Sequence, residues 1–207
     1  MATPEEKLHP GSVNLQPAEL PTPFESDTPV TPEQAPEIAG KFLASFAAKL
    51  TTRKYTDLRE CFLPNCYYRD MIVVTPDVRT LHGFDQILEY LSTSNRVFKS
   101  LSIQNKKTPS ATLAPLDPLQ TVSAITVHLV GETDIAKIRG LVTLVQDAGD
   151  SGKWKVFTLN TLVTAWIGLL EEQIGAHRPF ERELTPKKPE LKPGQLTGDD
   201  AAVLIVG

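Results

Sequence analysis

The chain has 207 residues with 25 Asp or Glu against 21 Lys or Arg, so its formal net charge is −4, and 41% of the residues are hydrophobic. This composition is typical of one soluble domain. Phosphate binding needs clustered Lys and Arg, and the chain has no basic run, so we expect no nucleic-acid partner. No window approaches the roughly 20 apolar residues of a membrane span, and the first thirty residues have no apolar signal region, so we expect a cytoplasmic protein without a membrane partner.

Proline divides the chain. Eight of the 17 prolines lie in residues 1–36, five in 37–175 and four in 176–207. Such proline-rich ends cannot build a core of their own, whereas roughly 140 residues between them can bury enough surface to fold alone. We therefore expect a proline-rich arm over 1–33, a folded domain over 34–174, a linker over 175–200 and a short strand over 201–207. Within the arm, Leu20, Phe24 and Val30 could dock on the body.

The cysteine count argues against a disulfide framework and a zinc site. The two cysteines, Cys61 and Cys66, are five residues apart and have no second pair beside them. A structural zinc site needs four ligands at set spacings. We expect two reduced thiols and no metal.

The first half of the folded region predicts helices followed by a strand. Thr31 can cap a helix that begins at Pro32, and apolar residues recur at helical spacing as far as Leu50. A second short helix is expected over 55–62, ended by Pro64-Asn65, then a strand over 66–74, a turn over 75–77 and a helix over 83–94. The stripe of the first helix comprises Ile38, Phe42, Phe46, Ala47 and Leu50, and that of the last comprises Phe84, Ile87, Leu88 and Leu91.

The second half predicts long strands joined by turns. The expected strands span about 97–105, 121–131, 135–146 and 153–165, with a Gly- and Asp-rich turn over 147–152. Helices that are segregated from strands define an α+β class. We predict a cone: a strongly curved antiparallel sheet wrapped around the N-terminal helices, with a pocket at its open end.

The last residues, Gly198 to Gly207, form a polar turn followed by a short apolar strand that ends on glycine. A dinucleotide-binding fold begins with such a strand and continues as Gly-x-Gly-x-x-Gly into a helix. Only the first glycine of that fingerprint, Gly207, could be present. The alternative is an ordinary hydrophobic tail.

Several motifs together resemble one family. They are Phe62-Leu63-Pro64 through Tyr68-Arg69-Asp70, then Thr75-Pro76-Asp77-Val78-Arg79-Thr80 with Gly83, and later Trp154 to Leu159, His177-Arg178-Pro179 and Val203 to Gly207. In this order they resemble the N-terminal domain of filamentous-fungal FAD-dependent monooxygenases, over roughly residues 38–207. The resemblance implies a nuclear-transport-factor-2-like (SnoaL-like) cone attached to an oxygenase that uses FAD and NADPH, in secondary metabolism.

The chain departs from that pattern in three places. Tyr68 and Pro76 stand where the family has Trp, and the flavin-binding body is missing after Gly207. Without that body no FAD phosphate can be held, so we expect no cofactor in this chain. Our first hypothesis is therefore a truncated relative that retains the accessory cone domain and lacks oxygenase activity.

Asp70 is the leading candidate for acid–base chemistry. It lies on the same strand face as Cys66 and Tyr68, so a carboxylate and a phenol could share a pocket wall. In an apolar cone the pKa of such a carboxylate would rise toward neutrality. The alternative is structural: Asp70 with Arg69, Asp77 and Arg79 could form ion pairs at a strand–turn–helix corner.

His128 could also face the pocket, since it alternates with Val127 and Leu129 within an expected strand. Its unperturbed pKa suits proton transfer, yet a lone strand histidine is more often structural.

An apolar end of the last strand suits a homodimer; its residues are Val163, Ala165, Trp166, Leu169 and Leu170.

Two further hypotheses stand beside the truncated monooxygenase. One is a cofactor-free isomerase, cyclase or dehydratase that acts on a polyketide- or terpenoid-like hydrophobic ligand, with Asp70, His128 or Tyr68 pointing into an open pocket. The other is a non-catalytic binding or dimerisation module. An apolar exposed sheet face without convergent polar groups would favour the module.

Overall fold

A computed structural model describes residues 19–25, 29–104 and 111–168 of the chain. The linker expected over 175–200, the terminal strand expected over 201–207 and the expected dimer residues Leu169 and Leu170 lie outside the described residues. So does most of the arm expected over 1–33.

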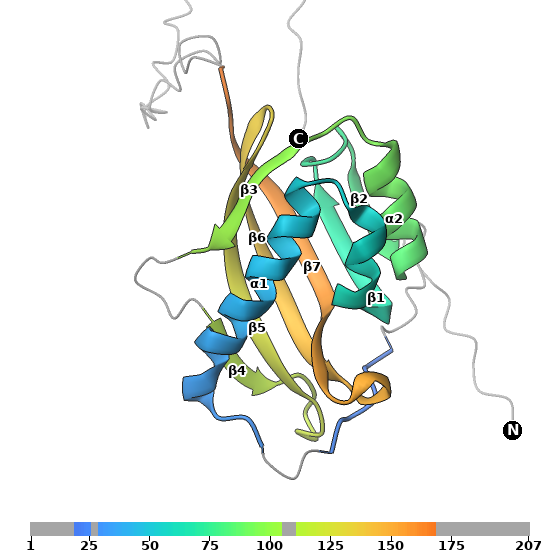
Figure 1. The fold of residues 1–207 in the computed structure, drawn as a ribbon, viewed down its shortest axis with the longest axis vertical. Helices are drawn as coiled ribbons and strands as arrows, with labels where there is room; N and C mark the ends of the chain where they lie inside the picture. Colours follow the sequence, from blue (N-terminus) through green and yellow to red (C-terminus); the bar gives the residue numbers. More distant parts are fainter. Residues whose placement is uncertain (1–18, 26–28, 105–110, 169–207) are drawn as a thin grey trace, which may run out of the picture. The chain divides into compact units, whose positions relative to one another are not determined.

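The helices lie on one face of a single sheet (Figure 1). A short 3-10 turn, η1 (Pro32–Gln34), leads into α1 (Ala35–Thr51), and η2 (Tyr55–Cys61) follows as a second 3-10 segment. Helix α2 (Phe84–Thr93) comes later, after Gly83. These elements agree with the helices expected from the sequence. Within the described residues, no helix combines the length and the apolar character that crossing a membrane requires.

The sheet has seven strands in the order β2–β1–β7–β6–β5–β3, with β4 paired to β5. Their bounds are β1 (Phe62–Met71), β2 (Val78–His82), β3 (Phe98–Ile103), β4 (Ala111–Pro115), β5 (Ser123–Thr133), β6 (Ala136–Asp147) and β7 (Lys153–Trp166). This arrangement confirms the predicted α+β class and the curved sheet beside N-terminal helices. All pairs are antiparallel except β1 with β7, which is parallel, so the sheet is mixed.

Two details of the sequence interpretation are wrong. Strand β1 does not start after Pro64-Asn65 but runs through both residues, because the β1–β7 register shifts between Phe62 and Tyr67 and this irregularity accommodates a residue without an N–H. Strands β2 and β4 are absent from the expected elements. Each has five residues and a largely exposed pattern, so neither has the apolar alternation that marks a strand in the sequence.

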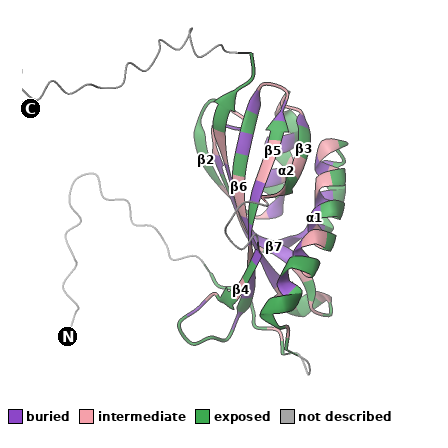
Figure 2. Cartoon of the chain, turned by 90° about the vertical axis from the view of Figure 1, so that its left-hand side faces the viewer, coloured by how far each residue is buried: buried purple, intermediate pink, exposed green. Residues whose placement is uncertain are grey.

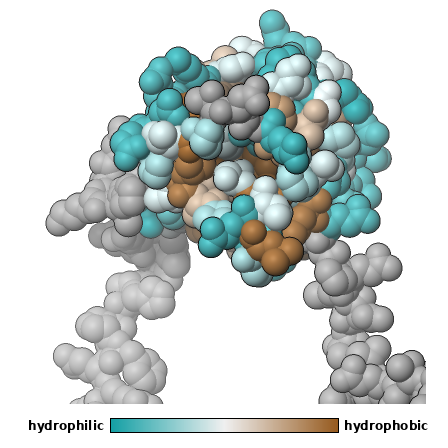
Figure 3. Space-filling view, turned by 90° about the horizontal axis from the view of Figure 1, so that it is seen from below, coloured by the Kyte–Doolittle hydropathy of each residue, from teal (hydrophilic) through white to brown (hydrophobic). Residues whose placement is uncertain are grey.

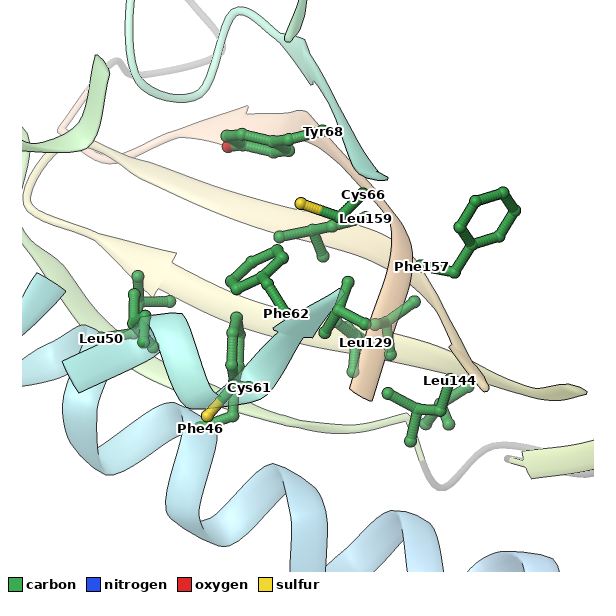
Figure 4. Packing of buried hydrophobic residues seen from close by; sticks show 14 of the residues in the cluster. Phe46, Leu50, Cys61, Phe62, Cys66, Tyr68, Leu129, Leu144, Phe157 and Leu159 are labelled. Atoms are coloured by element: carbon green, nitrogen blue, oxygen red, sulfur yellow. The ribbon is translucent and has the colours of Figure 1, made fainter. Parts of the chain in front are cut away.

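The core fills the space between α1, α2 and the inner face of the sheet (Figure 2). In α1 the fully buried stripe is rotated from the expected one toward smaller residues: Ala35, Ala39 and Leu43 are buried with Phe46 and Leu50, whereas Ile38 and Phe42 are half-buried. Figure 4 shows Phe46, Phe62 and Leu159 gathered between α1 and the strands, while the ring of Phe157 points away from them. Most of the core therefore lies on the side that carries the helices, although Phe157, which points away from it, is also buried and packs against Tyr67.

A short stretch of the arm docks on the β6–β7 hairpin. Pro21 is buried, Phe24 is half-buried, and the Phe24 ring lies directly against Gly152 in the hairpin turn. The docking expected of Phe24 therefore occurs, whereas Leu20 is 52% exposed. Seen from this end of the molecule, hydrophobic residues lie in the middle and at the lower edge of the view, and hydrophilic residues occupy most of the rest of the outline (Figure 3).

Candidate functional site

The most concentrated polar cluster of the interior is built around Asp70, whose side chain is completely buried on the inner face of β1. Its carboxylate accepts hydrogen bonds from three hydroxyls and two backbone amides. The donors are Tyr90 Oη at 2.7 Å, Thr161 Oγ1 at 3.0 Å, Val74 N at 3.0 Å, Val73 N at 3.1 Å and Tyr68 Oη at 3.4 Å. A buried carboxylate with this many donors keeps much of the solvation that water would supply.

The local backbone directs two of these donors. Strand β1 ends at Met71, and Ile72 then takes a φ of +61°, which is unusual for a β-branched residue. This turn brings the amides of Val73 and Val74 back onto the Asp70 carboxylate. We infer that the hydrogen bonds to Asp70 offset the strain at Ile72.

Both tyrosines of the cluster are held as neutral phenols. Burial, reinforced by the neighbouring Asp70 carboxylate, raises the pKa of Tyr68 well above its usual value, and burial is also the main cause that raises the pKa of Tyr90 to about 12. The Tyr68 hydroxyl also lies 2.9 Å from Thr161 Oγ1, and the Tyr90 hydroxyl lies 2.8 Å from Thr75 Oγ1. The cluster therefore consists of two branches of hydroxyl groups, Tyr90–Thr75 and Tyr68–Thr161, that meet at one carboxylate.

The cone beside this cluster is filled by side chains. The cavity that remains has a volume of about 10 Å³, which is room for at most one water molecule. Its polar lining consists of Tyr68 and Thr161, and the rest is apolar: Phe46, Leu50, Leu58, Phe62, Ile87, Leu91, Phe98, Leu101 and Leu159. A ligand of drug size needs a pocket of roughly 300 Å³ or more. In this conformation the cone has no space for such a ligand.

The structure separates the proposed catalytic residues. Tyr68 and Asp70 come together, with Cys66 buried on the same face, as the strand alternation predicts. The expected inward orientation of His128 does not occur. Val127 and Leu129 take the inner face of β5, so His128 is exposed on the outer face, opposite Leu141 of β6.

The expected ion-pair corner forms only in part. Asp77 and Arg79 pair at 3.3 Å on the surface, and Arg69 donates to Thr80 Oγ1 at 3.2 Å. Among the described residues, Asp70 takes part in no ion pair. Hydroxyls and amides occupy its oxygens instead, so the four-residue ion-pair interpretation is corrected for Asp70 and Arg69.

The sequence interpretation misses two members of the cluster. Tyr90 extends the helical stripe of Ile87 and Leu91, so its inward position could have been inferred from spacing. Thr161 meets Asp70 only because β1 and β7 pair in parallel, with these two residues opposite each other. Alternation within a strand gives no such cross-strand register.

The outer face of the sheet differs from the inner face, because no helix covers it among the described residues. Helices α1 and α2 leave it uncovered among the described residues (Figure 1), and half-buried apolar side chains lie along it. These are Tyr67, Met71, Val130, Leu141 and Leu162, which strand register and alternation place on this face. Tyr67 stacks on His82 with ring centroids 4.5 Å apart. We call these five residues the outer apolar face.

The described residues do not fit FAD. A flavin pyrophosphate needs a strand–glycine–helix turn with several glycines and free amides. In the described part of the chain, Gly83 links β2 to α2, but it is followed by Phe84, Asp85 and Gln86, which places an acidic side chain in the first helical turn. The residues quoted for a flavin strand, 201–207, lie outside the described residues, so the FAD and NADPH of the resembling family stay a prediction. No group of three His, Cys, Asp or Glu side chains converges as a metal site within the described residues.

Fold and site together define an α+β cone domain with a filled interior and a second sheet face that α1 and α2 leave uncovered (Figure 1). Among solved structures it is similar to nuclear transport factor 2 from Cryptosporidium parvum, with 15% identity, a TM-score of 0.44 and coverage of 63% of this chain and 95% of that one. It is also similar to the Chaetomium Mex67:Mtr2 subunits, with 10% identity, a TM-score of 0.46 and coverage of 62% of this chain and 98% of that one. A third similar structure is a scytalone dehydratase-like protein from Novosphingobium aromaticivorans, with 15% identity, a TM-score of 0.41 and coverage of 65% of this chain and 87% of that one. A scan against models of known families finds no match, and no curated protein matches the chain.

Proposed function

We propose that this domain is a non-catalytic dimerisation module that works through its outer apolar face. The observation that carries the proposal is the filled cone: about 10 Å³ of interior space holds no substrate. The outer face, in contrast, is large and carries the half-buried side chains of Tyr67, Leu141 and Leu162, although Ala124, Val145 and Phe157 toward the β6–β7 hairpin are buried. The four long strands β1, β7, β6 and β5, at about 4.8 Å spacing and about 30 Å length, give roughly 600 Å², and the shorter β2 and β3 extend this toward the roughly 800 Å² that each partner of a standard interface contributes.

A second copy of the chain is the occupant that fits this face best. Leu141 lies in its middle, and Tyr67, Met71 and Leu162 extend it toward β1 and β7. Charges lie among these residues in both signs, with Arg69 and Arg139 on the same face as Glu132. A two-fold interface repeats one surface on both partners, so a mixed apolar and doubly signed face suits it.

The test is a paired substitution followed by light scattering. Leu141→Glu introduces a charge at the centre of the face and is expected to convert the full chain from dimer to monomer. Leu119→Glu is the matched control, because Leu119 is 83% exposed in the β4–β5 connection, away from this face. A wild-type mass of one chain, 22.7 kDa, at all concentrations would overturn the proposal.

A cofactor-free enzyme is the second candidate, and the Tyr68–Asp70–Thr161 cluster favours it. The Tyr68 hydroxyl reaches the cone wall and is linked to a carboxylate through Thr161, which is a path for a proton. The substrate would be a polyketide- or terpenoid-like molecule, and the cone would have to open to admit it.

Its test uses 2-tetralone in D₂O, where enolisation exchanges the α-hydrogens for deuterium. Catalysed exchange that is lost in Tyr68→Phe and retained in Tyr67→Phe would support the enzyme, since Tyr67 lies on the outer face. An exchange rate equal to that of buffer would count against it.

The truncated-monooxygenase hypothesis has a separate test: a transcript that continues in frame after Gly207 as Gly-x-Gly-x-x-Gly would support an oxygenase body.

A further inference from the structure

A second hollow lies on the outer face, toward the β3 edge of the sheet. It has a volume of about 350 Å³, is open to solvent and is built from β3, β5, β6 and the end of β7. Its polar residues are Ser100, Ser102, Glu132, Lys137, Arg139 and Thr164. We call this hollow the outer cup.

The strand geometry explains why the sheet is hollowed at this point. The β3–β5 register shifts between Phe98 and Ser100, and the β6–β7 register shifts between Lys137 and Ile138. Such irregularities bend strands and redirect side chains, and they are frequent beside binding sites. Between them β3 and β5 approach closely, since a side chain at Gly131 would lie 2.4 Å from the Ser100 carbonyl oxygen.

The charges of the cup point to an anion. Lys137 and Arg139 are two residues apart on β6 and so share the outer face. Within the described residues neither cation is in an ion pair, although Glu132 is the cross-strand neighbour of Lys137. Two cations and one carboxylate leave one net positive charge, which attracts an anionic ligand.

The other polar side chains of the outer cup can form hydrogen bonds with hydroxyl groups of a ligand. Ser100 and Ser102 are exposed on β3, and the Thr164 hydroxyl already donates to the Lys137 carbonyl oxygen at 3.1 Å. The serine hydroxyls can donate or accept, and Glu132 accepts only. We propose that the outer cup binds a small hydroxylated carboxylate of the sugar-acid type, with Lys137 and Arg139 on the carboxylate and Glu132, Ser100 and Ser102 on the hydroxyls.

The test is a titration of the ¹⁵N-labelled full chain at constant ionic strength with gluconate, glucose 6-phosphate and glucose. Gluconate is expected to shift the amides of 100–102, 130–132 and 137–139 in a saturable way, and neutral glucose is not. Glucose 6-phosphate carries nearly two charges at neutral pH and distinguishes a phosphate site from a carboxylate site. Gluconate that gives no saturable shift, or binds no better than glucose, would overturn the proposal, and so would binding of glucose 6-phosphate without binding of gluconate.

Variants separate the cup from the rest of the face. Arg139→Gln is expected to weaken gluconate binding by about tenfold, because a charged hydrogen bond is lost. Arg69→Gln removes the same charge elsewhere on the outer face and is expected to leave binding within about twofold. Equal losses in both variants would contradict a built site. Leu141→Gln also disrupts the apolar centre of the face but adds no charge two residues from Arg139, so gluconate binding to that variant tests the cup independently of the dimer.

Discussion

The Tyr90 hydroxyl donates a 2.7 Å hydrogen bond to the buried carboxylate of Asp70 and thereby ties helix α2 to the end of strand β1. Thr161 ties β7 to the same carboxylate. Three elements that are distant in the sequence thus meet at one side chain. We call this meeting point at Asp70 the structural hub, and we expect that replacing Asp70 lowers the free energy of unfolding.

Asp70→Asn is expected to lower the free energy of unfolding by about 2–4 kcal/mol, because the new NH₂ group faces donors inside a buried network. Urea denaturation followed by circular dichroism measures it. Asp77→Asn is the matched control: Asp77 pairs with Arg79 on the surface, and its loss should change stability by less than about 0.5 kcal/mol. Equal effects of the two substitutions would contradict the hub.

Asp117 should make the fold sensitive to acid. Its carboxylate accepts from Val122 N at 2.8 Å and from the amide and hydroxyl of Thr121, and the Val122 hydrogen bond is the main cause that lowers its pKa below the usual value. A carboxyl whose folded pKa is depressed stabilises the fold above its unfolded pKa, about 3.9, and loses that contribution as pH falls through the folded pKa.

The wild type should lose more of its free energy of unfolding between about pH 6 and about pH 3 than the Asp117→Asn variant does, because the variant has no carboxyl at this position to protonate. Melting temperatures of both proteins across that range measure the effect. A wild type and variant that lose stability in parallel would show that Asp117 does not contribute to the acid sensitivity.

Both thiols should resist modification in the folded protein. Burial raises the pKa of Cys66 to about 12, and it raises the pKa of Cys61 although Lys49 lies close by and opposes the shift. Since the thiolate is the reactive form, iodoacetamide at about pH 8 should alkylate neither residue in the native chain and both in urea. Rapid native labelling, read by mass spectrometry, would contradict the burial.

The docked arm predicts a coupling between Phe24 and Gly152. Gly152 has a φ of +72°, and a Cβ there would lie 2.4 Å from the Phe24 ring. Gly152→Ala should cost about 2–4 kcal/mol, roughly 1–2 of it from the backbone conformation and the rest from the clash.

A double-mutant cycle separates these two contributions. In a Phe24→Ala background only the backbone cost of Gly152→Ala should remain. Gly168→Ala is a control with the same kind of backbone, since Gly168 has a φ of +82° and a Cβ added there would meet no described atom within 4 Å. A cost of Gly152→Ala that is unchanged without Phe24 would contradict the docking.

Periodicity predicts the elements that bury a clear apolar stripe, and it cannot predict those that lack one. Helix α2 and strand β5, for example, are expected because apolar residues recur in them at the right period: Ile87 and Leu91 in α2, and Val127 and Leu129 in β5. Strand β2 is nearly all exposed, and Val78 is 58% exposed, so its identity depends on pairing with β1.

The site shows the same limit. Alternation places Tyr68 and Asp70 on one face, whereas Thr161 joins them through a parallel pairing that the sequence does not reveal. The expectation for His128 is wrong because alternation shows which residues share a side but not which side is inner. Whether the cone is open or filled depends on side-chain volumes across several elements, which no single motif reports.

The most direct test of a filled cone is a methyl NMR titration of the full chain with 2-naphthol, a small hydroxylated aromatic probe. The methyl groups of Ile87 and Leu159 line the residual cavity of about 10 Å³ beside Tyr68. We expect their signals to stay unmoved at every probe concentration. A saturable shift of both signals would show that the cone opens to a ligand, and it would contradict a module that works through its outer face alone.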